Sequence, residues 1–398
     1  MNLVNDTMKG YLANSSMIRR MFEAGLELKK KYGADKVYDF SLGNPDLPPP
    51  AEVKKALSAI AEKADQPFAM GYMPNGGYPV LREKLAARLE EEQNFKGISG
   101  NDLILTCGAA GAINVFFHAV LTPGDEVITP VPYFVEYDFY VANHGGKLVR
   151  VPTKEFTFEL DLDAMEKAIN ANTRAIIINS PNNPTGQIYS REELTRLAEI
   201  IKAAEKKYNR VIYVVSDEPY RFLNFDGVEI PSAFDIFEHS VIMGSYSKNL
   251  SLPGERLGYI AVCPKIEGRE ELLGALTLCN RILGFVNAPA IGQQLLMACM
   301  DSTVDLNIYR ERREAMAQVL SDAGVEYTLP RGAFYFFPKS PVEDERVFVD
   351  ALLKERVLAV PGRGFGKPGY IRLTFCVSKE TILNSAESIA NAVKAVKE

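Results

Sequence analysis

The chain has 398 residues, of which 47% are hydrophobic and 24% charged, and its formal net charge is −6. These values are ordinary for a globular protein, and at roughly 100–200 residues per domain they suggest two or three domains. Because no basic excess exists, the chain is not expected to bind nucleic acid or an anionic membrane surface, although a local anion site stays open.

The five cysteines and three histidines are scattered, and no Cys-x-x-Cys motif occurs. Neither a metal site nor a disulfide framework is indicated, so the chain is predicted to be reduced and cytoplasmic. The first ten residues lack the apolar core of a signal peptide. The longest apolar runs are far shorter than the ~20 residues that a membrane span needs.

Strand and helix patterns alternate along most of the chain, beginning near the N-terminus. Residues 15–16 can begin a helix that Gly33 ends, and residues 37–42 alternate like a short strand. Pro50 and Pro79 each stand where the first turn of a helix accepts proline. These signals predict helices that precede the main series of strands.

The middle of the chain contains short apolar runs of the kind that buried parallel strands show. They cover residues 175–179 and 211–216, and further strands are predicted at 103–107, 241–245 and 257–262. Ser190 and Glu193 form a capping box that opens a long helix between two of them. This alternation predicts a doubly wound, mostly parallel α/β domain.

After about Ala290 the pattern changes to that of a smaller α+β domain. Helices are expected at 305–323, 343–355 and 379–397, with short strands between them. The chain is therefore predicted to divide into three segments: an N-terminal arm with part of the small domain at 1–45, a large domain at 46–288, and a small C-terminal domain at 289–398.

A lysine follows the predicted strand 241–245. Lys248 is flanked by Ser245 and Ser247, and Arg256 comes shortly after it. Two hydroxyls and a guanidinium can hold a phosphate, and a lysine beside them can form a Schiff base with a phosphorylated aldehyde such as pyridoxal 5′-phosphate. Taken alone, the motif is more often a solvated lysine in a turn.

Polar residues also end the strands at 211–216 and 175–179, on the edge of an α/β sheet where ligands bind. Asp217 can pair with a pyridinium nitrogen, and Tyr220 can donate to the phenolic oxygen of the same ring. Asn183, in a Pro/Asn/Gly segment, can orient that oxygen and a substrate carboxylate. Considered singly, Asp217 is more often a helix cap and Asn183 a turn residue.

Small residues separate the strand at 103–107 from the helix that follows it, in the order Gly108-Ala109-Ala110-Gly111. Such residues let backbone N–H groups at the start of the helix approach a phosphate. Close packing of the helix on the strand is an alternative reason for them.

These elements occur in the order typical of class I/II aminotransferases, the pyridoxal phosphate enzymes of fold type I that resemble aspartate aminotransferase. The resemblance covers nearly the whole chain. Further motifs that carry it are Gly43-Asn44-Pro45-Asp46, Tyr72 before Gly76-Gly77-Tyr78 and Leu81-Arg82, Pro132-Tyr133-Phe134, and Tyr370-Ile371-Arg372-Leu373. It implies an α/β fold with a large sheet domain and a smaller α+β domain.

The resemblance also implies a role for each site residue. Lys248 carries pyridoxal 5′-phosphate as a Schiff base and moves the proton, Asp217 pairs with the ring nitrogen, and Tyr220 and Asn183 bind the phenolic oxygen. The remaining assignments are the following: Tyr133 stacks on the ring; Ser245, Ser247, Arg256 and the backbone of Ala109 and Ala110 hold the phosphate; Arg372 and Gly43 bind the substrate α-carboxylate; and Tyr72 reaches the phosphate of the other subunit in a homodimer.

The implied reaction transfers an amino group between an L-amino acid and a 2-oxo acid by a ping-pong mechanism through the pyridoxamine form of the cofactor. Where aspartate-specific relatives carry a lysine for the distal carboxylate, this chain has Ala110, although Arg19, Arg20 or Arg281 are candidates to replace it. Asn44 and residues 17–20 are also candidates to line the substrate side chain.

Three rival functions remain. A cysteine-S-conjugate β-lyase would use nearly the same site. A nicotinamide dehydrogenase is disfavoured because the glycines at 362–366 precede a strand instead of opening a helix. A cofactor-binding regulator without activity has no basic patch or added DNA-binding segment to support it.

Overall fold

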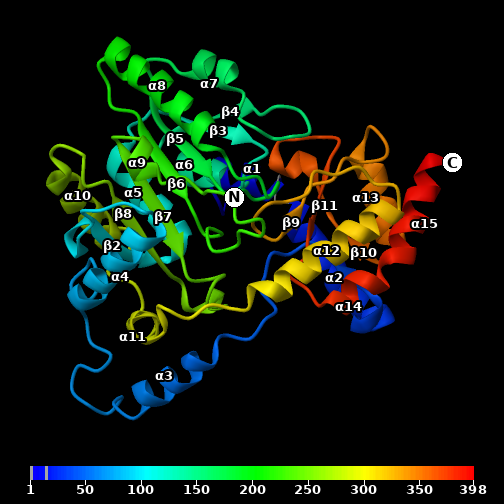
Figure 1. The fold of residues 1–398 in the computed structure, drawn as a ribbon, viewed down its shortest axis with the longest axis horizontal. Coiled ribbons are helices and arrows are strands. Elements are labelled where there is room, and N and C mark those ends of the chain that lie inside the picture. Colours follow the sequence, from blue (N-terminus) through cyan, green and yellow to red (C-terminus); the bar gives the residue numbers. More distant parts are fainter. Residues whose placement is uncertain (1–2, 14–16) are drawn as a thin grey trace.

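A seven-stranded sheet forms the centre of the larger of two lobes (Figure 1). The computed structural model describes residues 3–13 and 17–398. The strand order is β2-β8-β7-β6-β5-β3-β4, and β8 runs antiparallel to both of its neighbours. The strands are β2 (Leu103–Cys107), β3 (Glu126–Val131), β4 (Lys147–Pro152), β5 (Thr173–Asn179), β6 (Tyr213–Asp217), β7 (Ser240–Ser245) and β8 (Leu257–Val262). The predicted mostly parallel α/β domain is confirmed.

Helices of this lobe begin at the positions predicted for them after Pro50, at Pro79, at Gly108 and after Ser190. They are α3 (Ala51–Ala61), α4 (Pro79–Glu92), α5 (Gly108–Val120), α6 (Tyr137–Ala142), α7 (Leu162–Ala168), α8 (Arg191–Tyr208), α9 (Ala233–Ile236), α10 (Arg269–Ile282) and α11 (Ala290–Cys299). The capping box predicted for α8 forms, because Ser190 Oγ accepts from the Glu193 N–H and the Glu193 carboxylate accepts from the Ser190 N–H. α3 lies at the lower edge of this lobe in Figure 1.

The smaller lobe combines helices with short strands, in agreement with the expected α+β pattern. Its antiparallel sheet has the order β11-β12-β9, and β1 pairs in parallel with β10. The elements are α2 (Met17–Tyr32), β1 (Tyr38–Asp39), α12 (Leu306–Asp322), β9 (Tyr335–Phe336), α13 (Glu345–Lys354), β10 (Val357–Leu358), β11 (Val360–Pro361), β12 (Ile371–Thr374), α14 (Lys379–Asn384) and α15 (Ala386–Lys397).

Two details of this lobe differ from the sequence expectation. The strand at 37–42 shrinks to Tyr38–Asp39, since only these residues pair with β10. The single helix at 379–397 is two helices, separated at Ser385, whose buried hydroxyl donates to the carbonyl of Ile382 at 2.7 Å. The helix start predicted at residues 15–16 lies outside the described residues.

Two large apolar clusters form the cores of the lobes. Buried residues of the first extend from Val53 to Met300, and those of the second include Phe40 and residues from Tyr220 to Val393. The first cluster therefore continues past the boundary proposed at residue 288 and includes the buried face of α11. Phe40, from the N-terminal segment, lies in the second cluster.

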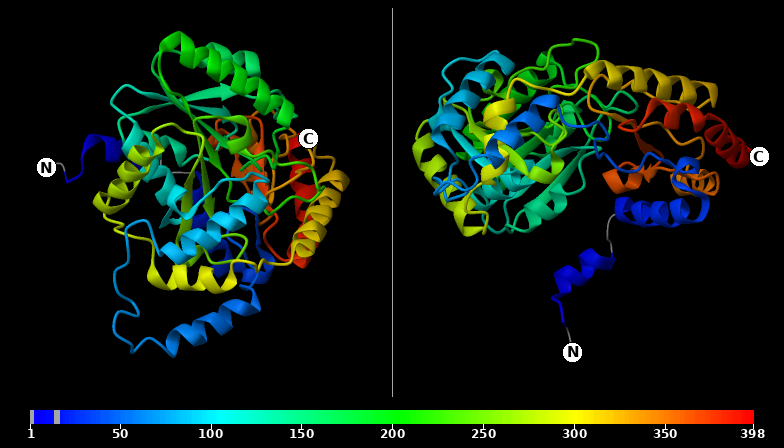
Figure 2. Two further views of the ribbon diagram at one scale, coloured as in Figure 1. Left: turned by 60° about the vertical axis from the view of Figure 1, so that its left-hand side comes forward. Right: turned by 90° about the horizontal axis from the view of Figure 1, so that it is seen from below.

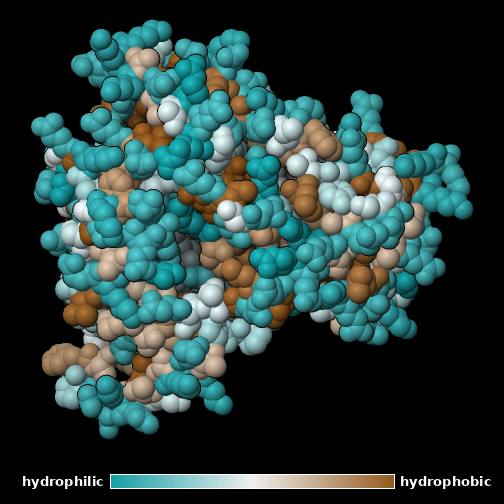
Figure 3. All heavy atoms as spheres, in the orientation of Figure 1, coloured by the Kyte–Doolittle hydropathy of each residue, from teal (hydrophilic) through white to brown (hydrophobic). Residues whose placement is uncertain are grey.

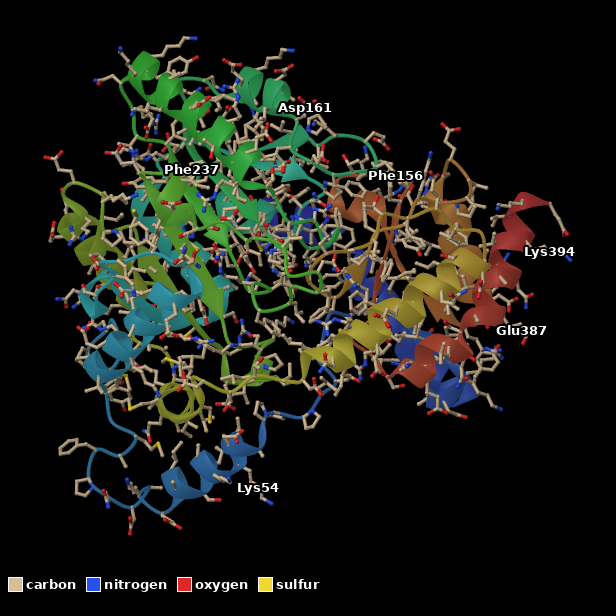
Figure 4. All side chains as sticks on the ribbon, viewed as in Figure 1. Lys54, Phe156, Asp161, Phe237, Glu387 and Lys394 are labelled. Carbon is tan, nitrogen blue, oxygen red and sulfur yellow. The ribbon has the colours of Figure 1, made fainter. Side chains whose placement is uncertain are left out.

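Several contacts join the lobes. Arg312 of α12 forms a two-pronged ion pair with Asp46, with distances of 2.6 and 2.9 Å. Figure 4 labels Phe156 on the loop that reaches from β4 toward the small lobe, and its carbonyl accepts from Thr328 Oγ1 at 2.6 Å.

α1 (Asp6–Ala13) projects from the side of the molecule (Figure 2), with the ring of Tyr11 against Phe139. No described helix is long and apolar enough to cross a membrane.

Candidate active site

A cavity of about 340 Å³ opens where the carboxyl ends of β5, β6 and β7 face the small lobe. Figure 3 shows apolar surface along this junction, whereas the outer surfaces of both lobes are mainly hydrophilic. All the predicted site residues except Tyr72 and Tyr133 line the cavity: Gly43, Ala109, Ala110, Asn183, Asp217, Tyr220, Ser245, Ser247, Lys248, Arg256 and Arg372. Residues far apart in sequence meet here because parallel strands end at one sheet edge.

Lys248 lies just past the end of β7, is partly buried and lines this cavity. Its Nζ donates to the carbonyl oxygen of Gly43 at 2.7 Å and lies 5.6 Å from the centre of the Phe334 ring. Burial lowers the pKa of Lys248 from 10.5 to about 8, since a charged ammonium is poorly solvated there. A substantial fraction of the amine is therefore neutral near pH 8, which a nucleophile requires.

Hydroxyls, backbone N–H groups and a guanidinium surround one end of the cavity. Ser245 Oγ donates to Ser247 Oγ at 2.9 Å. Arg256 has a positive φ of 51° and directly precedes β8. A Cβ on Gly258 would come within 2.5 Å of the Gly108 carbonyl carbon, so only glycine lets β8 lie this close to the start of α5. This cradle fits a phosphate at the N-terminus of α5.

Asp217 ends β6 and is buried. Its Oδ2 accepts from the hydroxyl of Tyr137 at 2.5 Å, while its Oδ1 has no hydrogen-bond partner among the described residues. Burial raises the pKa of Asp217 from 3.8 to about 7 because no described cation neutralises it. A buried carboxyl with one orphaned oxygen fits a protonated pyridine nitrogen, which would supply the missing positive charge.

An asparagine that the sequence analysis missed connects two strand ends. Asn179, the last residue of β5, donates from Nδ2 to the Asp217 carbonyl at 2.8 Å and accepts from the Asn183 N–H at 2.7 Å. It also lines the cavity. Its position at the carboxyl end of a predicted parallel strand was the available signal.

Arg372 lies in β12, buried, on the wall formed by the small lobe. One terminal nitrogen donates to the Ser41 carbonyl at 2.6 Å and the other to Asn183 Oδ1 at 3.2 Å. Its guanidinium carbon lies over the rings of Tyr335 and Phe365, 4.7 Å from each ring centre. Burial lowers the pKa of Arg372, yet arginine stays charged, so the site offers an enclosed cation for a carboxylate.

Tyr133 and Tyr72 are the two predicted site residues that do not line this cavity. The hydroxyl of Tyr133 is bonded to Asp138 and to Arg150 Nε, and its ring lies against the backbone of Gly366. The structure thus does not bring Tyr133 into the cavity, and its neighbour Phe134 lines it instead. Tyr72 is 92% exposed and does not reach the site of its own chain.

Two further aromatic residues were missed, Tyr137 beside the cavity and Tyr335 in its lining, because nothing in their sequence context distinguishes them from core aromatics. Tyr137 touches Asp217, as described above, and Tyr335 lies with its hydroxyl 3.0 Å from that of Tyr220. Of the candidate distal cations, Arg281 does not line the cavity and is exposed. The side chains of Arg19 and Arg20 lie outside the described residues, as do those of the rest of 17–20.

Comparison with known proteins gives consistent matches over the chain. A sequence profile described as aminotransferase class I and II matches residues 35–389. A probable aspartate/prephenate aminotransferase of Aquifex aeolicus is 31% identical over 93% of this chain and 94% of its own length. Among solved structures, an amino transferase of Eubacterium rectale (36% identity, TM-score 0.96) covers both chains completely. The aspartate aminotransferase of Thermus thermophilus with maleate (28% identity, TM-score 0.88) covers 98% of this chain and 100% of its own.

Proposed function

Because the chain belongs to the class I and II aminotransferases and is a transaminase, we propose that it holds pyridoxal 5′-phosphate on Lys248 and moves amino groups between L-amino acids and 2-oxo acids. Enzymes of this family depend on that cofactor, which stabilises negative charge at the substrate Cα and stores the amino group between two half-reactions. The observation that carries the proposal is the buried, orphaned Asp217 oxygen in one cavity with a lysine of lowered pKa.

Each site residue has a proposed role that follows from its position in the cavity. Lys248 provides the neutral amine that attaches the cofactor and then moves the proton at the substrate Cα. Asp217, held by Tyr137, keeps the ring nitrogen protonated, and Tyr220 and Asn183 contact the phenolic oxygen. The serines, Arg256 and the start of α5 hold the phosphate, Phe134 takes the stacking role expected of Tyr133, and Arg372 with Gly43 receives the α-carboxylate.

Five free cysteines in the described chain support a reducing, cytoplasmic location.

The function is tested by giving the loaded enzyme single amino acids without an acceptor. A transaminase releases one 2-oxo acid per site and stops, and the visible absorbance is lost until a 2-oxo acid is added. Continuous formation of ammonia and pyruvate from a cysteine conjugate would identify the β-lyase instead. The matches to named aminotransferases do not favour that alternative.

We expect the same screen to show that aspartate and glutamate are not privileged donors. The described cations that line the cavity are Lys248, Arg256 and Arg372, and each already has a role above. Leu42, Ile113, Phe134 and Tyr140 add apolar or aromatic surface, and a buried distal carboxylate would lack a partner there. Aromatic or medium-sized apolar donors should at least equal aspartate in kcat/KM. An advantage for aspartate of orders of magnitude would show that another residue supplies the cation.

Arg372→Lys should raise the amino-acid KM by about 10–100-fold and also lower kcat, because lysine keeps the charge but loses the two-pronged geometry. The resting absorbance should change little, since no phosphate or ring contact is removed. Arg331→Lys, at an exposed arginine outside the cavity, is the matched control. A variant that loses cofactor but keeps normal amino-acid kinetics would show that Arg372 holds the cofactor instead.

We also propose that the enzyme is a homodimer in which Tyr72 completes the partner's phosphate site. Supporting this, the loop after α3 carries two almost fully exposed aromatics, Phe68 and Tyr72, both 92% exposed in the single chain. Exposed apolar residues of this kind mark interaction surfaces. In a two-fold dimer the exchange is reciprocal, so both sites depend on it.

Complementation tests this arrangement. Lys248→Ala and Tyr72→Glu homodimers should each be nearly inactive, the second because a carboxylate faces the phosphate. In a mixed dimer one site carries both defects and the other carries neither, so random re-pairing should return about a quarter of wild-type activity. If mixed dimers form and no activity returns, Tyr72 does not act across the interface.

A further inference from the structure

Tyr335 lies at the centre of the contacts between residues already assigned to the site. It belongs to β9 of the small lobe and is only 2% exposed. The Arg372 guanidinium carbon lies over its ring, 4.7 Å from the ring centre, and lies at the same distance over the Phe365 ring. Its hydroxyl lies 3.0 Å from that of Tyr220.

The same hydroxyl also determines what can stand at position 43. A Cβ placed on Gly43 would lie 1.9 Å from the Tyr335 hydroxyl oxygen and 2.8 Å from Cζ. Only a glycine fits at this distance, and its carbonyl oxygen accepts from Lys248 Nζ. Tyr335 therefore contacts the backbone at Gly43, the Arg372 guanidinium and the Tyr220 hydroxyl, all three of which belong to residues that line the cavity.

The hydrogen bond between the two phenols has a direction once the cofactor is bound. Burial raises the pKa of Tyr335 to about 12 and that of Tyr220 well above 10, so both hydroxyls are protonated near neutral pH. A phenolate oxygen on the cofactor can only accept, so Tyr220 must donate its single proton to it. The proton between the two tyrosines then comes from Tyr335, and accepting it makes Tyr220 a stronger donor.

We propose that Tyr335 is a positioning residue of the transaminase that acts through two others: its hydroxyl orients and strengthens Tyr220, and its ring holds the Arg372 guanidinium for the substrate carboxylate. The inference rests on the proposed function, since it assumes that Tyr220 faces the cofactor and Arg372 the substrate. It adds to that function a residue whose hydroxyl and ring have separable effects.

Tyr335→Phe removes only the hydroxyl. The pH at which the visible absorption band of the loaded enzyme titrates should rise by about half a unit to one unit, because the weakened Tyr220 bond stabilises the anionic oxygen less. The KM for the amino acid should change less than about threefold, since the ring over Arg372 is kept. Tyr309→Phe is the matched control: Tyr309 is buried and stacked on Phe334, with a hydroxyl that has no described partner, and it does not line the cavity.

Tyr335→Leu removes the ring as well. It should show the same titration shift and, in addition, raise the amino-acid KM by about tenfold through loss of the stacked face. An unchanged titration in Tyr335→Phe, with Tyr309→Phe as reference, overturns the hydroxyl role even if Tyr335→Leu fails to fold. A folded Tyr335→Leu enzyme with normal KM overturns the ring role. If wild-type protein itself binds no cofactor, the proposed function has failed, which is a different result.

Discussion

Replacing Lys248 by alanine should lower transamination by at least about 10⁴-fold, because the covalent attachment point and the proton carrier are lost together. The purified variant should also lack the visible absorbance of the wild-type enzyme. Lys265→Ala is the matched control, since Lys265 lies outside the cavity and donates to the Phe234 carbonyl. A Lys248→Ala enzyme with more than a few per cent of wild-type activity would contradict the assignment.

The lowered pKa of this lysine adds a pH dependence to the same experiment. Cofactor-free protein reacts with the aldehyde only through the neutral amine, whose fraction rises with pH. Because burial lowers the pKa to about 8, the rate of covalent loading should increase with pH and reach half its maximum near pH 8. If the reacting lysine were an ordinary exposed one, the rate of covalent loading would still increase above pH 10.

Asp217→Asn should lower transamination by about 10³-fold or more while the cofactor still binds, since the shape is kept and the charge is lost. An asparagine cannot keep the ring nitrogen protonated, so the main electrostatic support for charge at the substrate Cα disappears. Asp235→Asn, at an exposed carboxylate paired with Arg191, provides the control. Unimpaired activity in Asp217→Asn contradicts the role.

Cofactor-free protein gives a second, independent readout of Asp217. Its pKa is raised from 3.8 to about 7 by burial, so the folded carboxyl holds a proton that the unfolded chain releases. The free energy of unfolding should therefore fall as pH rises from about 4 to 7. Asparagine does not titrate, so in Asp217→Asn this fall in the free energy of unfolding is absent. At pH 8 the cofactor-free variant should therefore have a higher Tm than cofactor-free wild type.

Much of the site was predictable because its residues follow strand ends that periodicity identifies. Lys248, Asp217 and Asn183 come directly after apolar runs, and parallel strands deliver their carboxyl ends to one edge. Arg372 was predictable only by resemblance, since its strand belongs to the other lobe and nothing local connects it to the sheet.

The rest depended on packing that sequence does not encode locally. The choice between Tyr133 and Phe134 is decided by Asp138 and Arg150, which hold the Tyr133 hydroxyl away from the cavity. Tyr137 and Tyr335 look like core aromatics until the fold places their hydroxyls beside Asp217 and Tyr220. The first apolar cluster includes α11 because its buried face packs on the large lobe, although the pattern changes at its start.

Borohydride reduction of the resting enzyme, followed by peptide mapping, tests the central claim most directly. It fixes a Schiff base as a stable secondary amine at the lysine that carries it. We predict that one cofactor per chain is fixed on the peptide containing Lys248 and that prior conversion with an amino donor prevents the fixation. Cofactor fixed on another lysine, or a protein that stays colourless with added pyridoxal 5′-phosphate, would contradict the account.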